Sequence, residues 1–151
     1  MSSPPVHHID VRAFRYATEV PERVRSALQA IYPTFGEPDE PVLERAVTEG
    51  HYGNEIEICT LTLTRADEFR TFFDQLRRNG DIATIIEQLD DRVTEDCDLF
   101  LRFDKQHAYT AGRLDLGDGI EVRIRIEAYP AKRESAIENI HEYLTSLMEG
   151  R

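Results

Sequence analysis

The sequence is nearly free of lysine. Of its 18 basic residues only Lys105 and Lys132 are lysines, and the rest are arginines. Acidic residues number 29, which gives a formal net charge of -11 at pH 7. An acidic surface with few lysines keeps a protein hydrated and dispersed in molar salt, so we interpret the chain as a halophile's protein. The alternative, an acidic protein with no special solvent, leaves the lysine deficit unexplained.

Tryptophan, paired cysteines and long apolar runs are also missing. The chain has two cysteines, and Cys59 and Cys97 each lie in a strand-like apolar pattern that favours buried thiols over a disulfide or a metal site. No apolar run approaches the roughly 20 residues that cross a bilayer, and residues 1–5 lack the features of a signal peptide. We therefore expect a cytoplasmic protein with one domain over residues 1–151, a length that holds a core without disulfides.

Motifs of enzyme active sites are absent from the sequence. It contains no Walker loop, nucleophile motif or zinc-ligand spacing. His7 and His8 are adjacent, so we expect them to point to opposite faces of a strand, which suits no shared metal ion. The one cluster that suggests catalysis has His107 or Asp104 as general base and Lys105 to stabilise negative charge. We expect a protein that is not an enzyme and that uses no metal or cofactor.

What the sequence does contain is a series of periodic segments. Strand patterns cover six ranges: 6–14, 42–48, 56–63, 97–103, 113–116 and 120–126. Helical spacing of apolar residues covers four: 20–31, 69–76, 82–89 and 137–147. Elements in this order predict an α+β protein, a two-layer sandwich with a mainly antiparallel sheet of about six strands and helices packed on one face. In the range 56–63 the apolar phase switches, which indicates a bulge or a strand covered on both faces.

The same alternation predicts which side chains lie on the sheet face opposite the helices. That face receives His8, Arg12, Phe100, Arg102, Arg123 and Arg125, interleaved with Asp10, Glu121 and Glu127. Arginine can pair with phosphate and stack on bases, and an exposed Phe100 adds stacking area, so this face is a candidate platform for RNA. The competing interpretation is a lattice of cross-strand salt bridges.

Two polar loops are further candidates for a site. In residues 50–54, Gly-His-Tyr-Gly-Asn, two glycines let backbone amides approach a phosphate, although an ordinary hairpin turn has the same composition. The second loop follows the strand 97–103, where we expect turn structure over residues 104–112. Lys105 in that loop is either a functional cation or one partner of a salt bridge at the strand end.

Three segments, taken together, resemble a known family. Residues 6–14 with 17–19, residues 50–54 and residues 101–106 are similar to the archaeal RNA-binding family that is catalogued as a predicted exosome subunit. The likeness extends from residue 6 to about residue 128. It implies a fold like that of large-subunit ribosomal protein five. It also implies RNA binding in RNA processing or exosome-linked degradation, with structured RNA and exosome subunits as partners.

We predict that the two loops converge on RNA. The expected RNA-binding residues are Gly50, His51, Tyr52, Gly53, Asn54, Arg102, Lys105 and Gln106, with Asp104 orienting Lys105. The lysine and the arginine would contact phosphates, the glutamine and the asparagine would contact sugar or base edges, and the histidine or the tyrosine would stack on a base. Two alternatives stay open: a protein-interaction module without RNA contact, and a hydrolytic or phosphoryl-transfer enzyme.

Overall fold

A computed structural model gives the arrangement of the chain, and it describes residues 3–16, 19, 21–33, 43–49 and 55–149. These residues form five strands and six helices. In chain order they are β1 (Val6–Tyr16), α1 (Pro21–Ile31), β2 (Leu43–Glu49), β3 (Glu55–Leu63), α2 (Ala66–Asn79), α3 (Ile82–Glu87), α4 (Leu89–Arg92), β4 (Asp98–Asp104), α5 (Lys105–Ala111), β5 (Gly119–Ile126) and α6 (Arg133–Met148). None of these helices has the length and apolar character needed to span a membrane.

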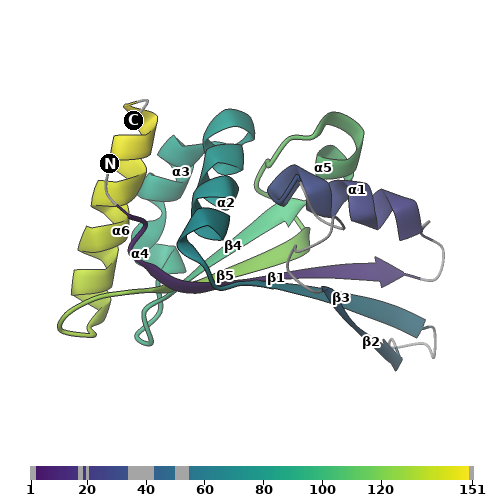
Figure 1. Cartoon of the computed structure of the whole chain (residues 1–151), viewed down its shortest axis with the longest axis horizontal. Helices are drawn as coiled ribbons and strands as arrows, with labels where there is room; N and C mark the ends of the chain where they lie inside the picture. The colour runs from purple at the N-terminus through teal and green to yellow at the C-terminus, as the bar shows by residue number, and fades with distance from the viewer. Residues whose placement is uncertain (1–2, 17–18, 20, 34–42, 50–54, 150–151) are drawn as a thin grey trace.

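The strands form one sheet in the order β2-β3-β1-β5-β4, and every neighbouring pair is antiparallel. Figure 1 shows α1, α2, α3 and α5 on the same side of this sheet, with α6 next to α3. The short helix α4 lies beside β4, at the edge of the sheet, where the backbone of Val93 pairs with that of Leu99. This arrangement confirms the expected α+β class, the antiparallel sheet and the packing of the helices on one face.

The core lies between the sheet and the helices because alternate strand residues turn toward them. In the two central strands the inward side chains, Ile9, Val11, Ala13, Ile120, Val122 and Ile124, have no exposed surface. They belong to one cluster with Phe72, Phe73 and Leu76 of α2 and with Ile140 and Leu144 of α6. Cys59 and Cys97 are buried in the same cluster, as the strand patterns predict, and neither forms a disulfide within the described residues.

Carboxylates define where two of the helices begin. The carboxylate of Glu68 accepts hydrogen bonds at 2.9 Å from the backbone N–H groups of Thr64 and Arg65, ahead of α2. Asp81 accepts at 3.1 Å from the backbone N–H of Thr84 at the start of α3. Each contact satisfies N–H groups that have no partner within the helix.

The expected count of about six strands is wrong, because the range 113–116 forms no strand. Its backbone makes only two isolated bridges in the described structure, between Leu114 and Gly80 and between Leu116 and Phe103. The N–H of Leu114 donates to the carbonyl of Asn79 at 2.9 Å, which ties this segment to the end of α2. The alternation over four residues therefore marks a connection and not a strand.

The turn expected over residues 104–112 is a helix, α5. The carboxylate of Asp104 accepts from the backbone N–H of His107 at 2.9 Å, which caps the first turn. Gly112 ends the helix with a φ of 64°, a left-handed conformation that glycine adopts without strain. An aspartate and a glycine at the two ends of a seven-residue segment were the sequence signals for this helix.

One smaller expectation about strand geometry also needs correction, and the structure decides between two others. The register of β1 against β5 shifts between Val6 and His8, and the two histidine rings approach each other with Nδ1 atoms 2.9 Å apart instead of pointing to opposite faces. No shift interrupts β3 against either neighbour, so its change of apolar phase is not a bulge, and the burial of β3 favours the alternative of a strand covered on both faces. The change of phase arises because Ile56 and Ile58 are half-buried on the outer face, while Cys59 is buried on the inner one.

Gly119→Ala tests how closely β5 approaches α5. Gly119 has a φ of 111°, and an added Cβ would lie 2.6 Å from the Cβ of Lys105. Backbone strain and overpacking together should lower the free energy of unfolding by about 2–5 kcal/mol. The matched control is Gly112→Ala, where φ is also positive but no atom lies within 4 Å of the added Cβ. Urea denaturation should rank Gly119→Ala well below Gly112→Ala, and equal losses would contradict the close approach.

Candidate nucleic-acid interface

The outer face of the sheet carries the side chains that the alternation places there. Arg12, Arg102 and Arg123 are exposed on it, and Phe100 keeps 44% of its surface exposed. The strand register sets these residues in two rows. One row reads Phe100, Arg123, Asp10 and Thr62 across β4, β5, β1 and β3, and the next reads Arg102, Glu121, Arg12 and Thr60.

These rows, apart from Thr62, form the floor of a hollow of about 610 Å³. Asp91, Arg92 and Thr94, from α4 and the segment that follows it, line the side of the hollow next to β4. Arg92 is fixed in this wall, because it donates from Nε to the side chain of Gln88 at 2.8 Å and from Nη1 to the carbonyl of Phe100 at 3.2 Å. The open face is therefore concave at Phe100.

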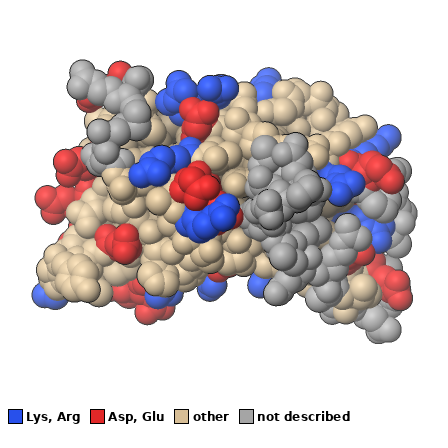
Figure 2. All heavy atoms as spheres, viewed as in Figure 1, with Lys and Arg blue, Asp and Glu red and all other residues tan. Residues whose placement is uncertain are grey.

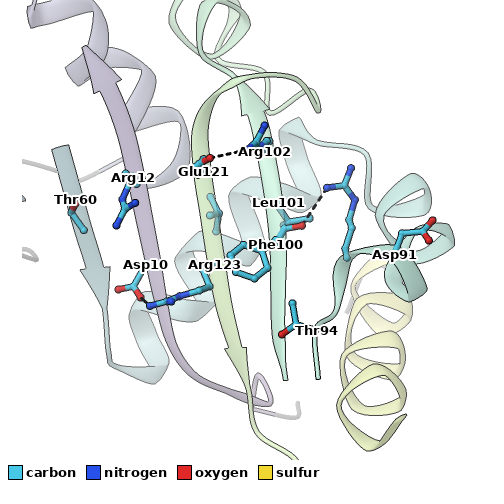
Figure 3. Close-up of a pocket in the computed structure, with 12 residues that line it drawn as sticks. Asp10, Arg12, Thr60, Asp91, Thr94, Phe100, Leu101, Arg102, Glu121 and Arg123 are labelled. Atoms are coloured by element: carbon cyan, nitrogen blue, oxygen red, sulfur yellow. Dashed lines mark hydrogen bonds and ion pairs between the residues drawn. The ribbon is translucent and has the colours of Figure 1, made fainter. Parts of the chain in front are cut away.

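Ion pairs join most of the charged residues of this face. Arg123 donates to the carboxylate of Asp10 at 2.8 Å, and Arg102 donates to that of Glu121 at 3.1 Å. Both contacts are drawn in Figure 3. The lattice of cross-strand salt bridges is therefore present. Exposed pairs of this kind contribute only about 0–1 kcal/mol each, so a ligand can displace them at small cost.

The carboxylate of Asp10 accepts hydrogen bonds from two side chains. Partial burial would by itself raise its pKa, but hydrogen bonds from Arg123 and Thr62 outweigh burial and hold the pKa of Asp10 below its ordinary value. Thr62 donates its hydroxyl to Asp10 at 3.0 Å. Asp10 thus stays ionised on this face and keeps the Arg123 guanidinium neutralised.

Arg12 differs from the other arginines of the hollow. Its cross-strand neighbour Glu121 pairs with Arg102 instead, and no hydrogen bond or ion pair joins the Arg12 side chain to the part of the chain that the structure describes. Figure 3 shows Arg12 between the strands that carry Thr60 and Glu121, on the hollow's side of the sheet. It is a guanidinium whose donors can bind an incoming anion without first leaving a carboxylate.

Charge within the hollow nearly balances. Its lining includes four arginines, at positions 12, 92, 102 and 123, against three carboxylates, at positions 10, 91 and 121. One net positive charge remains. Elsewhere the surface shows the same mixing: on the face in view in Figure 2, basic and acidic side chains are interspersed and form no continuous basic patch.

Arg125, the remaining arginine expected on this face, is held by a buried carboxylate. It donates from Nε to Asp98 Oδ1 at 2.7 Å and from Nη2 to Oδ2 at 3.1 Å. Only 5% of Asp98 is exposed. This two-pronged contact raises the pKa of Arg125 and assigns it a structural role at the start of β4.

Lys105 does not have the accessible position that a phosphate contact requires. Only 7% of the residue is exposed. Its ammonium group pairs with Glu19 at 2.6 Å, donates to the carbonyl of Phe14, and lies 5.1 Å from the centre of the Tyr16 ring. Of the two interpretations of this lysine, the structure has the salt bridge. The expected role in phosphate binding is therefore corrected.

The other residues of the 101–106 motif are also divided between locations. Arg102 lies on the outer face of β4, whereas α5, which begins at Lys105, packs with α1 in the helical layer. Asp104 caps α5 through His107 and does not orient Lys105, which corrects its expected role. Gln106 is exposed on α5. A short polar motif thus serves both layers of the fold.

The expected convergence of the two loops involves residues 50–54, Gly50 to Asn54, which lie outside the described residues. Their flanking residues Glu49 and Glu55 are paired at the ends of β2 and β3. This is the same end of the sheet as Asp104, but β1 and β5 separate β3 from β4. The composite site therefore stays a prediction.

The predicted site set omitted the residues around which the hollow is built. Arg12, Phe100 and Arg123 were expected on the open face, but only Arg102 of that face was included in the set. Arg92 and Thr94 were missed, because residues 90–98 read as an acidic connection. The available signal was the alternation of β1, β4 and β5, which the register converts into two polar rows.

A one-sided antiparallel sheet whose open face presents an aromatic ring among arginines is a surface typical of single-stranded nucleic-acid binding. Comparison of the sequence with known families also indicates a protein that binds nucleic acid. A family model described as RNA binding matches residues 8–126, and the chain belongs to this family.

Several archaeal proteins are similar to the chain over most of its length. An RNA-binding protein of Pyrococcus abyssi is 33% identical over 144 residues, which cover 91% of this chain and 93% of that protein. A crystal structure from Archaeoglobus fulgidus is 34% identical with a TM-score of 0.76 and covers 91% of this chain and 98% of its own. A structure from Methanothermobacter thermautotrophicus is 37% identical with a TM-score of 0.76, covering 92% and 98%.

Lys105→Ala should destabilise the protein. The substitution leaves Glu19 partly buried without its cation and removes the link between α5 and the end of β1, so we expect the free energy of unfolding to fall by about 2–4 kcal/mol at neutral pH. The matched control is Lys132→Ala, because Lys132 is exposed and is the other lysine of the chain. Urea denaturation of both variants measures the difference.

The pH dependence of stability tests whether loss of the Lys105–Glu19 ion pair causes this destabilisation. Burial would raise the pKa of Glu19, but hydrogen bonds from Lys105 and from the Tyr16 backbone lower it below the ordinary value of 4.5. The stabilisation is therefore present above pH 4.5 and is lost as the pH falls through the folded-state pKa. The gap between Lys105→Ala and the wild type should narrow on acidification. A gap that does not change with pH would argue against this pair.

Proposed function

We propose that the chain binds RNA through the open face of its sheet. The observation that carries this proposal is the hollow in which exposed Phe100 lies on the same face as Arg12, a guanidinium with no described partner. Membership of an RNA-binding family and the similarity to the Pyrococcus abyssi protein support it. The aromatic ring offers stacking area and the guanidinium offers two parallel donors to a phosphate.

The neighbouring arginines can bind RNA only by exchanging a carboxylate partner for a phosphate. Arg102 and Arg123 already hold carboxylates, and an RNA phosphate would take the place of Glu121 or Asp10 as their partner. Such an exchange adds less to the free energy of RNA binding than a phosphate contact with Arg12 does, since one ion pair is lost for each one gained. RNA binding therefore depends mainly on Arg12 and Phe100, and the lattice positions them without adding much net attraction.

Several finer features belong to the same proposal. Structured RNA as the ligand, a place in RNA processing or exosome-linked degradation, and a fold like that of ribosomal protein five rest on the family resemblance. A halophile's cytoplasm rests on the lysine deficit and the net charge of -11. Residues 50–54 and Gln106 are proposed as additional RNA contacts at one end of the sheet. No residue is assigned a catalytic role.

A second candidate function is the docking of a protein partner on the same face. Farther along the strands from Arg12, Phe14 is paired with Ile58 and Tyr16 with Ile56. Phe14, Ile56 and Ile58 are half-buried, and Tyr16 is 46% exposed. An apolar end of an otherwise polar face is typical of a protein interface. The RNA proposal is preferred because the hollow and its unpartnered guanidinium match an anionic ligand.

Arg12→Ala should weaken RNA binding. We expect about a tenfold loss of affinity for a 20-nucleotide stem-loop, measured by fluorescence anisotropy across a KCl series. The slope of log affinity against log salt should fall by about one, since one phosphate contact is removed. The matched control is Arg78→Ala on α2, an equally charged change in the helical layer where Arg78 pairs with Asp74. Equal affinities of the two variants would reject the open face as the binding surface.

The proposed link to the exosome has a separate test. The tagged chain, purified from the archaeal cells that produce it, should retain exosome subunits detectable by mass spectrometry. Loss of those subunits after ribonuclease treatment would show that RNA forms the link, and their retention would show direct contact. Absence of the subunits before treatment would remove the exosome from the proposal, while RNA binding by the purified chain would be unaffected.

A further inference from the structure

The hollow on the open face has the chemistry of a site for one nucleotide. It holds one exposed aromatic ring, Phe100, one arginine without a described partner, Arg12, and one net positive charge. We propose, on the basis of the proposed function, that it recognises an unpaired nucleotide, such as a bulged or looped base in a structured RNA. The base stacks on Phe100 and the phosphate binds Arg12.

The charge of the hollow limits how many phosphates it can accept. Asp10 and Glu121 lie in the floor next to Arg123 and Arg102, and their carboxylates repel any phosphate that does not displace them. A duplex brings two rows of closely spaced phosphates to a protein surface. A surface with one net positive charge cannot neutralise such rows. A single phosphate at Arg12 matches the available charge.

The spacing of the two residues suits a nucleotide. Phe100 and Arg12 lie in adjacent rows on β4 and β1, with β5 between them. Two strand spacings, combined with the offset of two residues between the rows, put their Cα atoms about 12 Å apart. Both side chains rise from the floor of the same hollow. Figure 3 shows the Phe100 ring directed toward β5, on the side of β4 that faces β1. A base and its phosphate, joined through the ribose, can bridge this interval.

The aromatic ring gives the strongest preference for an unpaired base. Bases within an A-form helix are stacked on each other, so their faces cannot reach a protein side chain, whereas bases in loops and bulges can be splayed out. Thr60 and Thr94 also line the hollow, and their hydroxyls can donate or accept hydrogen bonds at a base edge or a 2′-hydroxyl. A duplex would leave Phe100 without a stacking partner.

Two RNAs that differ by one nucleotide test this inference: a 12-base-pair duplex, and the same duplex with one bulged 2-aminopurine. Anisotropy should give about 5–150-fold tighter binding of the bulged RNA by the wild type, the range that base-aromatic stacking supplies. The fluorescence of 2-aminopurine should be quenched on binding. Phe100→Ala should lose both the preference and the quenching, and Phe100→Tyr should keep both.

Tyr129→Ala is the matched control, because Tyr129 is a fully exposed aromatic residue outside the hollow. It should leave the preference for the bulge unchanged. Equal binding of the two RNAs, or a preference that survives Phe100→Ala, would overturn the unpaired-nucleotide inference. In that case the proposed function would still stand if Arg12→Ala weakened the binding of both RNAs. Failure of the wild type to bind either RNA would overturn both proposals and favour the protein-docking alternative.

Discussion

The rest of the structure depends on the burial of only one face of its sheet. Helices cover the inner side, so alternate residues of β1, β4 and β5 form the core and the residues between them must be compatible with water. The register then determines which outer residues become neighbours. It places Glu121 between Arg102 and Arg12, and Asp10 beside Arg123. The pairing of these few side chains decides which cation stays available, and that cation is Arg12.

Removal of Lys105 from the surface follows from the same layering. Helix α5 begins directly after β4 and turns into the helical layer, so its first residue is carried inward, where Glu19 and the carbonyl of Phe14 receive the ammonium group. A charge in this position stabilises the connection between two elements and cannot also reach a ligand. In the proposed site, recognition of an anion therefore falls to arginine, a residue that can also stack and can bind phosphate with two donors.

Sequence reasoning succeeded where a pattern was local and failed where the outcome depended on distant partners. The alternation of 97–103 and 120–126 gave the strands and their outward residues, because burial on one face imposes a period of two. The shorter alternation at 113–116 wrongly predicted a strand, because it does not show that the backbone of Leu114 bonds to Asn79 at the end of α2. The partner of Lys105 lies 86 residues away, and no spacing rule identifies it. Similarly, both Arg12 and Arg102 lie opposite Glu121, and only side-chain geometry reveals which arginine it binds.

An acidic chain that binds RNA presents an apparent conflict between its net charge of -11 and the charge of its ligand. The conflict depends on the range over which charges act. In dilute buffer the field of the whole protein would oppose the approach of RNA, but at about 1 M salt the Debye length is roughly 3 Å and only contacts within the hollow remain effective. The proposed stacking of a base on Phe100 does not depend on net charge and would persist under those conditions. The proposed binding face, with one available guanidinium and one exposed aromatic ring, is therefore consistent with the brine environment that we infer from the lysine-poor composition.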